Sequence, residues 1–168
     1  MTGSSQMQTA PLAITMGDPA GIGPEIVAKL GAYQTEGLPP ILVIGDAGIL
    51  RRAAQLCGVD VPVLDVDSSA LGSLRRGVLN TLQAGPPLPL DLPVGQVSAT
   101  AGAAAYGYIA RGVELALKGQ VSGLVTAPIN REGLKGAVVA HPGETEILAE
   151  LSGASHVGMV LANDELRV

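Results

Sequence analysis

Residues 12–30 read LAITMGDPAGIGPEIVAKL, which is an apolar stretch, a glycine-rich run and an amphipathic stretch in succession. This order predicts a β-strand, a sharp turn and an α-helix. Gly17, Gly21 and Gly23 permit tight turning and close approach of a ligand to the backbone, and Pro24 suits the first turn of a helix. The free N–H groups of such a helix start can bind an anion. A turn that binds no ligand explains the pattern equally well, because the spacing matches neither GxGxxG nor a P-loop.

The alternation of strand and helix signals continues along the chain. Residues 41–45 form a continuous apolar run, Asp46 can cap a helix that follows it, and residues 61–66 predict another strand. Repeated units of this kind indicate a parallel sheet with right-handed crossovers. Residues 67–93 carry four prolines and predict an excursion or a short ribbon.

A second set of elements follows. Residues 98–118 predict a long helix with a face of small residues, and residues 121–126 and 157–162 predict two more strands. We therefore expect an α/β fold. We expect three parts: a disordered leader at residues 1–10, a first α/β domain at residues 11–120, and the incomplete start of a second α/β domain at residues 121–168.

Composition excludes several classes of function. Of the 168 residues, 47% are hydrophobic and 15% charged, which argues against disorder. The net charge of -5 and the absence of Trp and Phe argue against a nucleic-acid partner. Cys57 is the single cysteine, so no internal disulfide is expected. With no secretory signal in the first ten residues and no membrane-spanning run, we expect a cytoplasmic protein without a membrane partner.

Polar residues follow the predicted strands at three places, residues 17–25, 126–130 and 141–146. Ligands bind beyond the carboxyl ends of strands in such sheets, so these segments predict one shared cleft. The candidate cleft residues are Asp18, Gly21, Gly23, Thr126, Asn130 and Arg131. Two of them have simpler explanations, because Asp18 suits a turn and Asn130 suits a helix cap. The two histidines are far apart in sequence, so no metal site is expected within this chain.

Several motifs carry a resemblance to a known family. MGDPAGIGPE at residues 16–25, VTAPIN at 125–130, the G-x-T-E turn at 143–146, and GQ-x-S at 95–98 occur in the right order. Together they resemble the 4-hydroxythreonine-4-phosphate dehydrogenase family of pyridoxal phosphate biosynthesis. That family includes the threonate- and erythronate-phosphate dehydrogenase paralogues.

The resemblance implies an isocitrate/isopropylmalate-dehydrogenase-like fold, with parallel sheet layers, helices on both faces, and an active site at a homodimer interface. It implies NAD(P)-dependent, divalent-metal-assisted oxidation of 4-hydroxythreonine 4-phosphate or a four-carbon sugar-acid phosphate. Family members are longer, and their metal-ligand histidines fall beyond Val168, so the chain is truncated relative to the family. The catalytic residues stay unknown at this stage.

The resemblance also makes Glu144 and Thr145 substrate-binding residues, at the turn that contacts the substrate phosphate. The family usually has His where this chain has Glu144, and Lys where it has Arg131. A carboxylate about 4 Å from a phosphate charge costs roughly 1 kcal/mol in water and about 4 kcal/mol at an effective dielectric near 20. A phosphorylated substrate should therefore bind more weakly unless Arg131 compensates.

Two other classes of function fit the sequence. The chain could be a non-catalytic remnant or a small-anion binding module of the same fold. It could also be a different glycine-loop enzyme on a similar sheet, such as an acyl or phosphoryl transferase.

Overall fold

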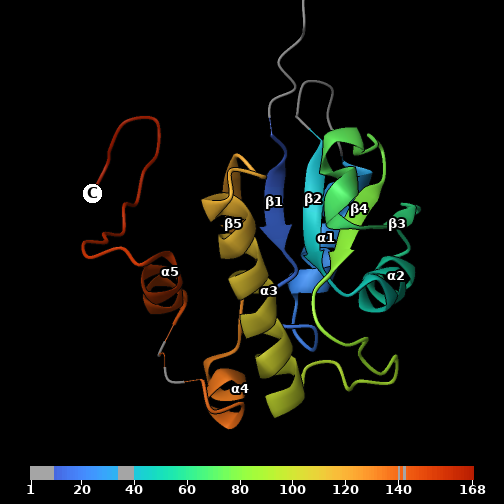
Figure 1. The fold of residues 1–168 in the computed structure, drawn as a ribbon. Helices are drawn as coiled ribbons and strands as arrows, with labels where there is room; N and C mark the ends of the chain where they lie inside the picture. Colours follow the sequence, from blue (N-terminus) through green and yellow to red (C-terminus); the bar gives the residue numbers. More distant parts are fainter. Residues whose placement is uncertain (1–9, 34–39, 140, 142) are drawn as a thin grey trace, which may run out of the picture.

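The computed structural model describes residues 10–33, 40–139, 141 and 143–168 (Figure 1). The predicted leader lies outside the described residues, apart from Ala10. The strands are β1 (Leu12–Thr15), β2 (Ile41–Gly45), β3 (Val63–Val66), β4 (Leu79–Gln83) and β5 (Gly123–Thr126). The helices are α1 (Gly23–Ala32), α2 (Ala47–Leu56), α3 (Ala99–Leu117), α4 (Arg131–Gly136) and α5 (Glu144–Ser152), with a 3₁₀ turn over Ser68–Ser73.

The strands form one parallel sheet in the order β3-β4-β2-β1-β5, which confirms the predicted α/β class. The chain moves in one direction from β1 to β2 through α1, and in the other direction from β4 to β5 through α3. Right-handed crossovers therefore place α1 and α3 on opposite faces of the sheet. The direction in which strands are added to the sheet reverses at β1. The carboxyl ends of β1 and β5 therefore border the crevice where ligands usually bind.

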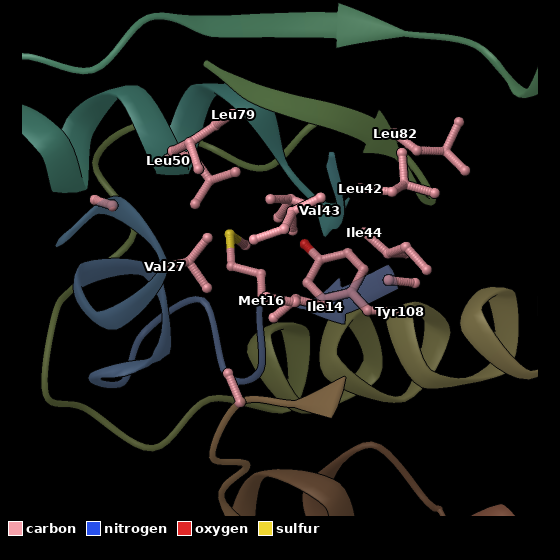
Figure 2. Close-up of a cluster of buried hydrophobic side chains, with 14 of the residues drawn as sticks. Ile14, Met16, Val27, Leu42, Val43, Ile44, Leu50, Leu79, Leu82 and Tyr108 are labelled. Atoms are coloured by element: carbon pink, nitrogen blue, oxygen red, sulfur yellow. The ribbon is translucent and has the colours of Figure 1, made fainter. Parts of the chain in front are cut away.

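The core packs on both faces of β2, whose five residues are all buried. On one face, Gly112 of α3 lies against Ile44 and Leu124. On the other face, Gly31 of α1 lies against Leu79. Figure 2 shows this cluster, with Tyr108 of α3 beside Ile44 and with Val27 of α1 near Met16. Burial of these side chains holds the strand ends, and thus the loops that follow them, in fixed positions.

The interpretation of residues 67–93 as an excursion or ribbon is wrong, because they contain the buried inner strand β4. Asn80 and Thr81 interrupt the apolar pattern there, yet both are buried. The Asn80 amide donates to the carbonyl oxygens of Ile41 at 3.2 Å and Arg75 at 2.8 Å, and its Oδ1 accepts from the Arg75 N–H at 2.9 Å. These bonds satisfy a polar side chain that local patterning places on a surface.

The strand predicted over residues 157–162 is also not formed. Residues 152–168 are exposed, and Leu161 and Val168 exchange two backbone hydrogen bonds of 2.8 Å in a narrow antiparallel ribbon. Figure 1 shows this ribbon, in red, extending away from the sheet. β5, which lies beyond the predicted domain boundary at residue 120, joins the sheet beside β1. The division into two domains stays a prediction. None of the described helices has the length and hydropathy needed to cross a membrane.

Candidate functional site

The glycine-rich loop after β1 lies directly against the loop after β5. The Asp18 N–H donates to the carbonyl oxygen of Pro128 at 2.9 Å. Gly17 has a φ of 74°, and a Cβ there would lie 2.8 Å from the Ala127 carbonyl. A Cβ on Gly23 would lie 3.3 Å from the Met16 carbonyl carbon and closer still to its oxygen. These two glycines therefore permit close contact between backbone segments.

Asp18 turns back onto its own loop. Its carboxylate Oδ1 accepts from the Ala20 N–H at 2.8 Å, and the residue is buried. Burial raises the pKa of Asp18, although hydrogen bonds from the Ala20 and Gly21 backbone act in the opposite direction. Asp18, Gly21 and Gly23 do not line the cavity at the end of β5. The observed bond of Asp18 is the one that orders a turn.

That cavity has a volume of about 340 Å³ and opens between the carboxyl end of β5 and the start of α5. Its lining residues are Thr126, Pro128, Ile129, Arg131, Gly143 and Glu144. The structure thus brings together three of the predicted site residues, Thr126, Arg131 and Glu144. The Arg131 guanidinium lies beside Gly143, because a Cβ there would be 3.8 Å from Nη2 and 3.9 Å from Nε.

Helix α4 fixes the position of Arg131. Asn130 caps this helix as predicted, with Oδ1 accepting from the Gly133 N–H at 3.0 Å. Gly102 of α3 lets the backbone of α4 approach closely, since a Cβ there would lie 2.7 Å from the Leu134 nitrogen. Asn130 therefore acts on the cavity through the helix that it caps, and it does not line the cavity itself.

Glu144 is the first residue of α5 and lies half-buried in the cavity wall. Its N-cap, Gly143, offers no side-chain hydrogen bond, and the first helical bond runs from Ile147 to Gly143. The N–H groups of the first turn, including that of the half-buried Thr145, thus have no partner within the helix. Such a helix start favours an anion.

The carboxyl group of Glu144 is poorly satisfied. Its Oε1 atom is buried and has no hydrogen-bond partner. Burial raises the pKa of Glu144, and a hydrogen bond with the Thr126 hydroxyl, which lowers it, is the smaller effect. A buried carboxylate oxygen without a donor is costly, so this atom favours either a proton or a ligand that donates one.

The described residues do not fit a metal ion on their own, because no three His, Cys, Asp or Glu side chains among them lie close enough together. His141 pairs with Glu150 beside a separate cavity, and His156 contacts Ser155 on the exposed ribbon. A pocket beside Gly21 holds only about 10 Å³, too little for a nicotinamide nucleotide.

Sequence analysis missed the contacts that Asp46 makes with Gln83 and Leu88 at this edge of the sheet. Asp46 caps α2 as predicted, accepting from the Ile49 N–H at 2.9 Å. Its second oxygen also accepts from the Leu88 N–H at 2.8 Å and from Gln83 Nε2 at 3.1 Å. Gln83 ends β4, and a polar residue closing a strand would have been the signal had that strand been recognised.

Comparison with known proteins gives the family. The sequence model of pyridoxal phosphate biosynthetic protein PdxA matches residues 38–168. The chain belongs to the PdxA family. A 4-hydroxythreonine-4-phosphate dehydrogenase of Beijerinckia indica is 45% identical over 157 residues, which are 94% of this chain and 46% of that protein. A D-threonate 4-phosphate dehydrogenase of Salmonella typhimurium is 40% identical over 166 residues, covering 96% and 50%.

The fold agrees with that assignment. The crystal structure of a 4-hydroxythreonine-4-phosphate dehydrogenase from Burkholderia phymatum superimposes with a TM-score of 0.86 at 42% identity, covering 94% of this chain and 48% of that one. This chain thus spans about half the length of the PdxA relatives it matches. Those relatives are named dehydrogenases, so the PdxA family that includes this chain is an oxidoreductase family.

Proposed function

We propose that this chain forms the substrate-phosphate subsite of a NAD(P)-dependent, divalent-metal-assisted dehydrogenase. Its substrate would be a phosphorylated hydroxy acid, either 4-hydroxythreonine 4-phosphate or a four-carbon sugar-acid phosphate. The single observation that carries this proposal is the cavity in which the Arg131 guanidinium lies beside Gly143, the N-cap residue of α5. Support for the reaction comes from the names of the PdxA relatives.

Each residue of the cavity has a distinct part in this proposal. Arg131 binds the phosphate oxygens with its planar, permanently charged fork, and the first turn of α5 donates N–H groups to them. Thr126 supplies a hydroxyl beside Glu144, and Pro128 and Ile129 form the rest of the wall. The phosphate end would fix the position of the hydroxyl group that is oxidised.

The described residues hold no group of three His, Cys, Asp or Glu side chains close enough together for a metal ion, so we assign no chemical step to them. The proposed reaction therefore needs groups in addition to those described here. The test is reduction of NAD or NADP by the protein with D-threonate 4-phosphate or 4-hydroxythreonine 4-phosphate and a divalent metal. Cofactor reduction that falls sharply in Arg131→Ala is expected.

A small-anion binding module of the same fold is the second candidate function, because Arg131 and the start of α5 line one cavity. Binding of the phosphorylated acids without any cofactor reduction, with every metal tried, would favour this candidate. Absence of both binding and reduction would contradict both functions.

We also propose that the protein forms a homodimer. Six large apolar side chains of the exposed ribbon, at residues 157–168, are between 55% and 73% exposed. The apolar residues are Val157, Met159, Val160, Leu161, Leu166 and Val168. Exposed apolar groups at this density favour association. Sedimentation should give a dimer. A stable monomer for the double variant Met159→Lys, Leu161→Lys would place the dimer contact on the ribbon.

A further inference from the structure

The carboxylate of Glu144 is an unexpected group in the lining of a cavity proposed to bind phosphate. Glu144 contributes a negative charge, or a neutral acid when protonated, to the same space that Arg131 and the start of α5 make attractive to anions. A fully ionised phosphate ester would meet like charge there, and the partly buried position weakens solvent screening. The ligand must therefore either avoid the carboxylate or bring a hydrogen-bond donor to it.

The charged groups around Glu144 do not supply that donor. Arg131 of α4 lies beside Gly143, and Oε1 of Glu144 is buried without a partner. On α5, the exposed Glu146 adds a second negative group, with its Oε2 3.2 Å from a Cβ position on Gly143. His141 is engaged with Glu150 beside the other cavity, and the Asp18 carboxylate is bonded to the Ala20 N–H. Thr126 of β5 provides one hydroxyl.

Phosphate esters differ from other oxyanions of their shape in one useful respect. Their second pKa is about 6, so about half of the ester still carries a proton at pH 6 and about one tenth at pH 7. The P–OH of this form can donate to a carboxylate, and its other oxygens can still accept from Arg131 and backbone N–H groups. A sulfate ester has the same charge and shape as the protonated phosphate ester but has no proton to donate.

We propose that Glu144 makes this cavity select the singly protonated form of a phosphate ester, with one proton held between a phosphate oxygen and the Glu144 carboxylate. Arg131 and the first turn of α5 bind the oxygens that carry the negative charge. This inference rests on the proposed function of the cavity, and it adds which ionic form of the substrate binds there. The raised pKa of Glu144 is consistent with a carboxyl group that shares a proton readily.

The test uses the chain as it stands with two probes, methyl phosphate and methyl sulfate. Affinity is measured by calorimetric titration at constant ionic strength at about pH 6 and about pH 8, on either side of the phosphate pKa. At pH 6 we expect methyl phosphate to bind about tenfold more tightly than methyl sulfate, the usual worth of one hydrogen bond to a charged group. At pH 8 the affinity for methyl phosphate should fall about fiftyfold, because the protonated share of the ester falls from about one half to about one hundredth.

Glu144→Gln should reverse this dependence. The glutamine amide can donate to an oxyanion and carries no charge. Methyl phosphate should therefore bind to this variant at least as tightly at pH 8 as at pH 6. At pH 6 the affinities of the variant for methyl sulfate and methyl phosphate should differ by no more than about threefold. Glu144→Ala, which removes the carboxylate without adding a titratable group, is a second variant in which the affinity for methyl phosphate should likewise not fall at pH 8. Glu132→Gln is the matched control, because Glu132 is exposed, pairs with Lys135 and does not line the cavity. It should behave like the starting protein.

Three results would overturn the inference. Affinity for methyl phosphate that rises with pH in the starting protein excludes a shared proton, and so does equal binding of the two esters at pH 6. Binding of both esters only in Glu144→Gln would mean that Glu144 merely repels anions, which leaves the proposed anion subsite intact. Binding of neither ester by any variant that retains the native circular dichroism spectrum would contradict the anion subsite and the inference together.

Discussion

Substitution of Gly102 by alanine gives a direct test of how α3 positions the anion cavity. A Cβ on Gly102 would lie 2.7 Å from the Leu134 nitrogen and closer still to the Gly133 carbonyl, whereas ordinary contact begins at 3.4 Å. Helix α4 must therefore retreat by at least about 0.7 Å, and rigid backbone rather than a flexible side chain has to move. Because Arg131 begins α4, this shift also displaces the guanidinium in the cavity wall.

The magnitude follows from two opposing effects. Overpacking against backbone costs about 1–3 kcal/mol, and the severity of this contact places it near the upper limit. Alanine gains about 1 kcal/mol over glycine in a helix. The free energy of unfolding should thus fall by about 2 kcal/mol in Gly102→Ala. Gly107 is the matched control in the same helix, because a Cβ there has no atom within 4 Å, so Gly107→Ala should gain about 1 kcal/mol.

Urea denaturation of both variants, followed by far-ultraviolet circular dichroism, measures this difference. With a slope of about 2 kcal/mol per molar urea, the midpoint of Gly102→Ala should lie about 1 M below that of the starting protein. Gly107→Ala should lie slightly above it. If Gly102→Ala matched Gly107→Ala in midpoint, α3 and α4 would not be packed backbone to backbone, and the argument would fail.

Three further outcomes are expected from denaturation of single variants. Asn130→Ala should cost about 1 kcal/mol of unfolding free energy, because α4 loses its N-terminal cap, while Asn130→Asp should cost far less. Asp46→Ala should cost about 3 kcal/mol, since a buried carboxylate there accepts from Ile49, Gln83 and Leu88; a loss no larger than that of Asn130→Ala would contradict the role of the second oxygen. Burial raises the pKa of Glu144 above 4.5, so its contribution to stability is complete below pH 4.5 and declines as pH rises through the raised pKa. Relative to the starting protein, Glu144→Gln should therefore gain stability as pH increases, and parallel pH profiles of the two proteins would refute the burial argument.

Much of the fold could be predicted because the deciding interactions are local. The caps formed by Asp46 and Asn130 join residues three apart, and the structure forms both. The continuous apolar run of β2 likewise marks a strand buried on both faces. β4 could not be recognised, because Asn80 is satisfied by Ile41, 39 positions away, and by Arg75. Local pattern does not show where a buried amide finds its partners.

The candidate site divides in the same way. By itself, the sequence determined which residues follow the strand ends, and its motifs determined the family, because turn and cap chemistry depends on neighbouring residues. Only the tertiary structure decided that Arg131, Thr126 and Glu144 share one cavity while Asp18 turns away from it. The cavity exists because Gly102 lets α4 pack against α3 and because α5 starts beside the guanidinium. Such contacts depend on the paths of whole elements through space, and no spacing along the chain encodes them directly.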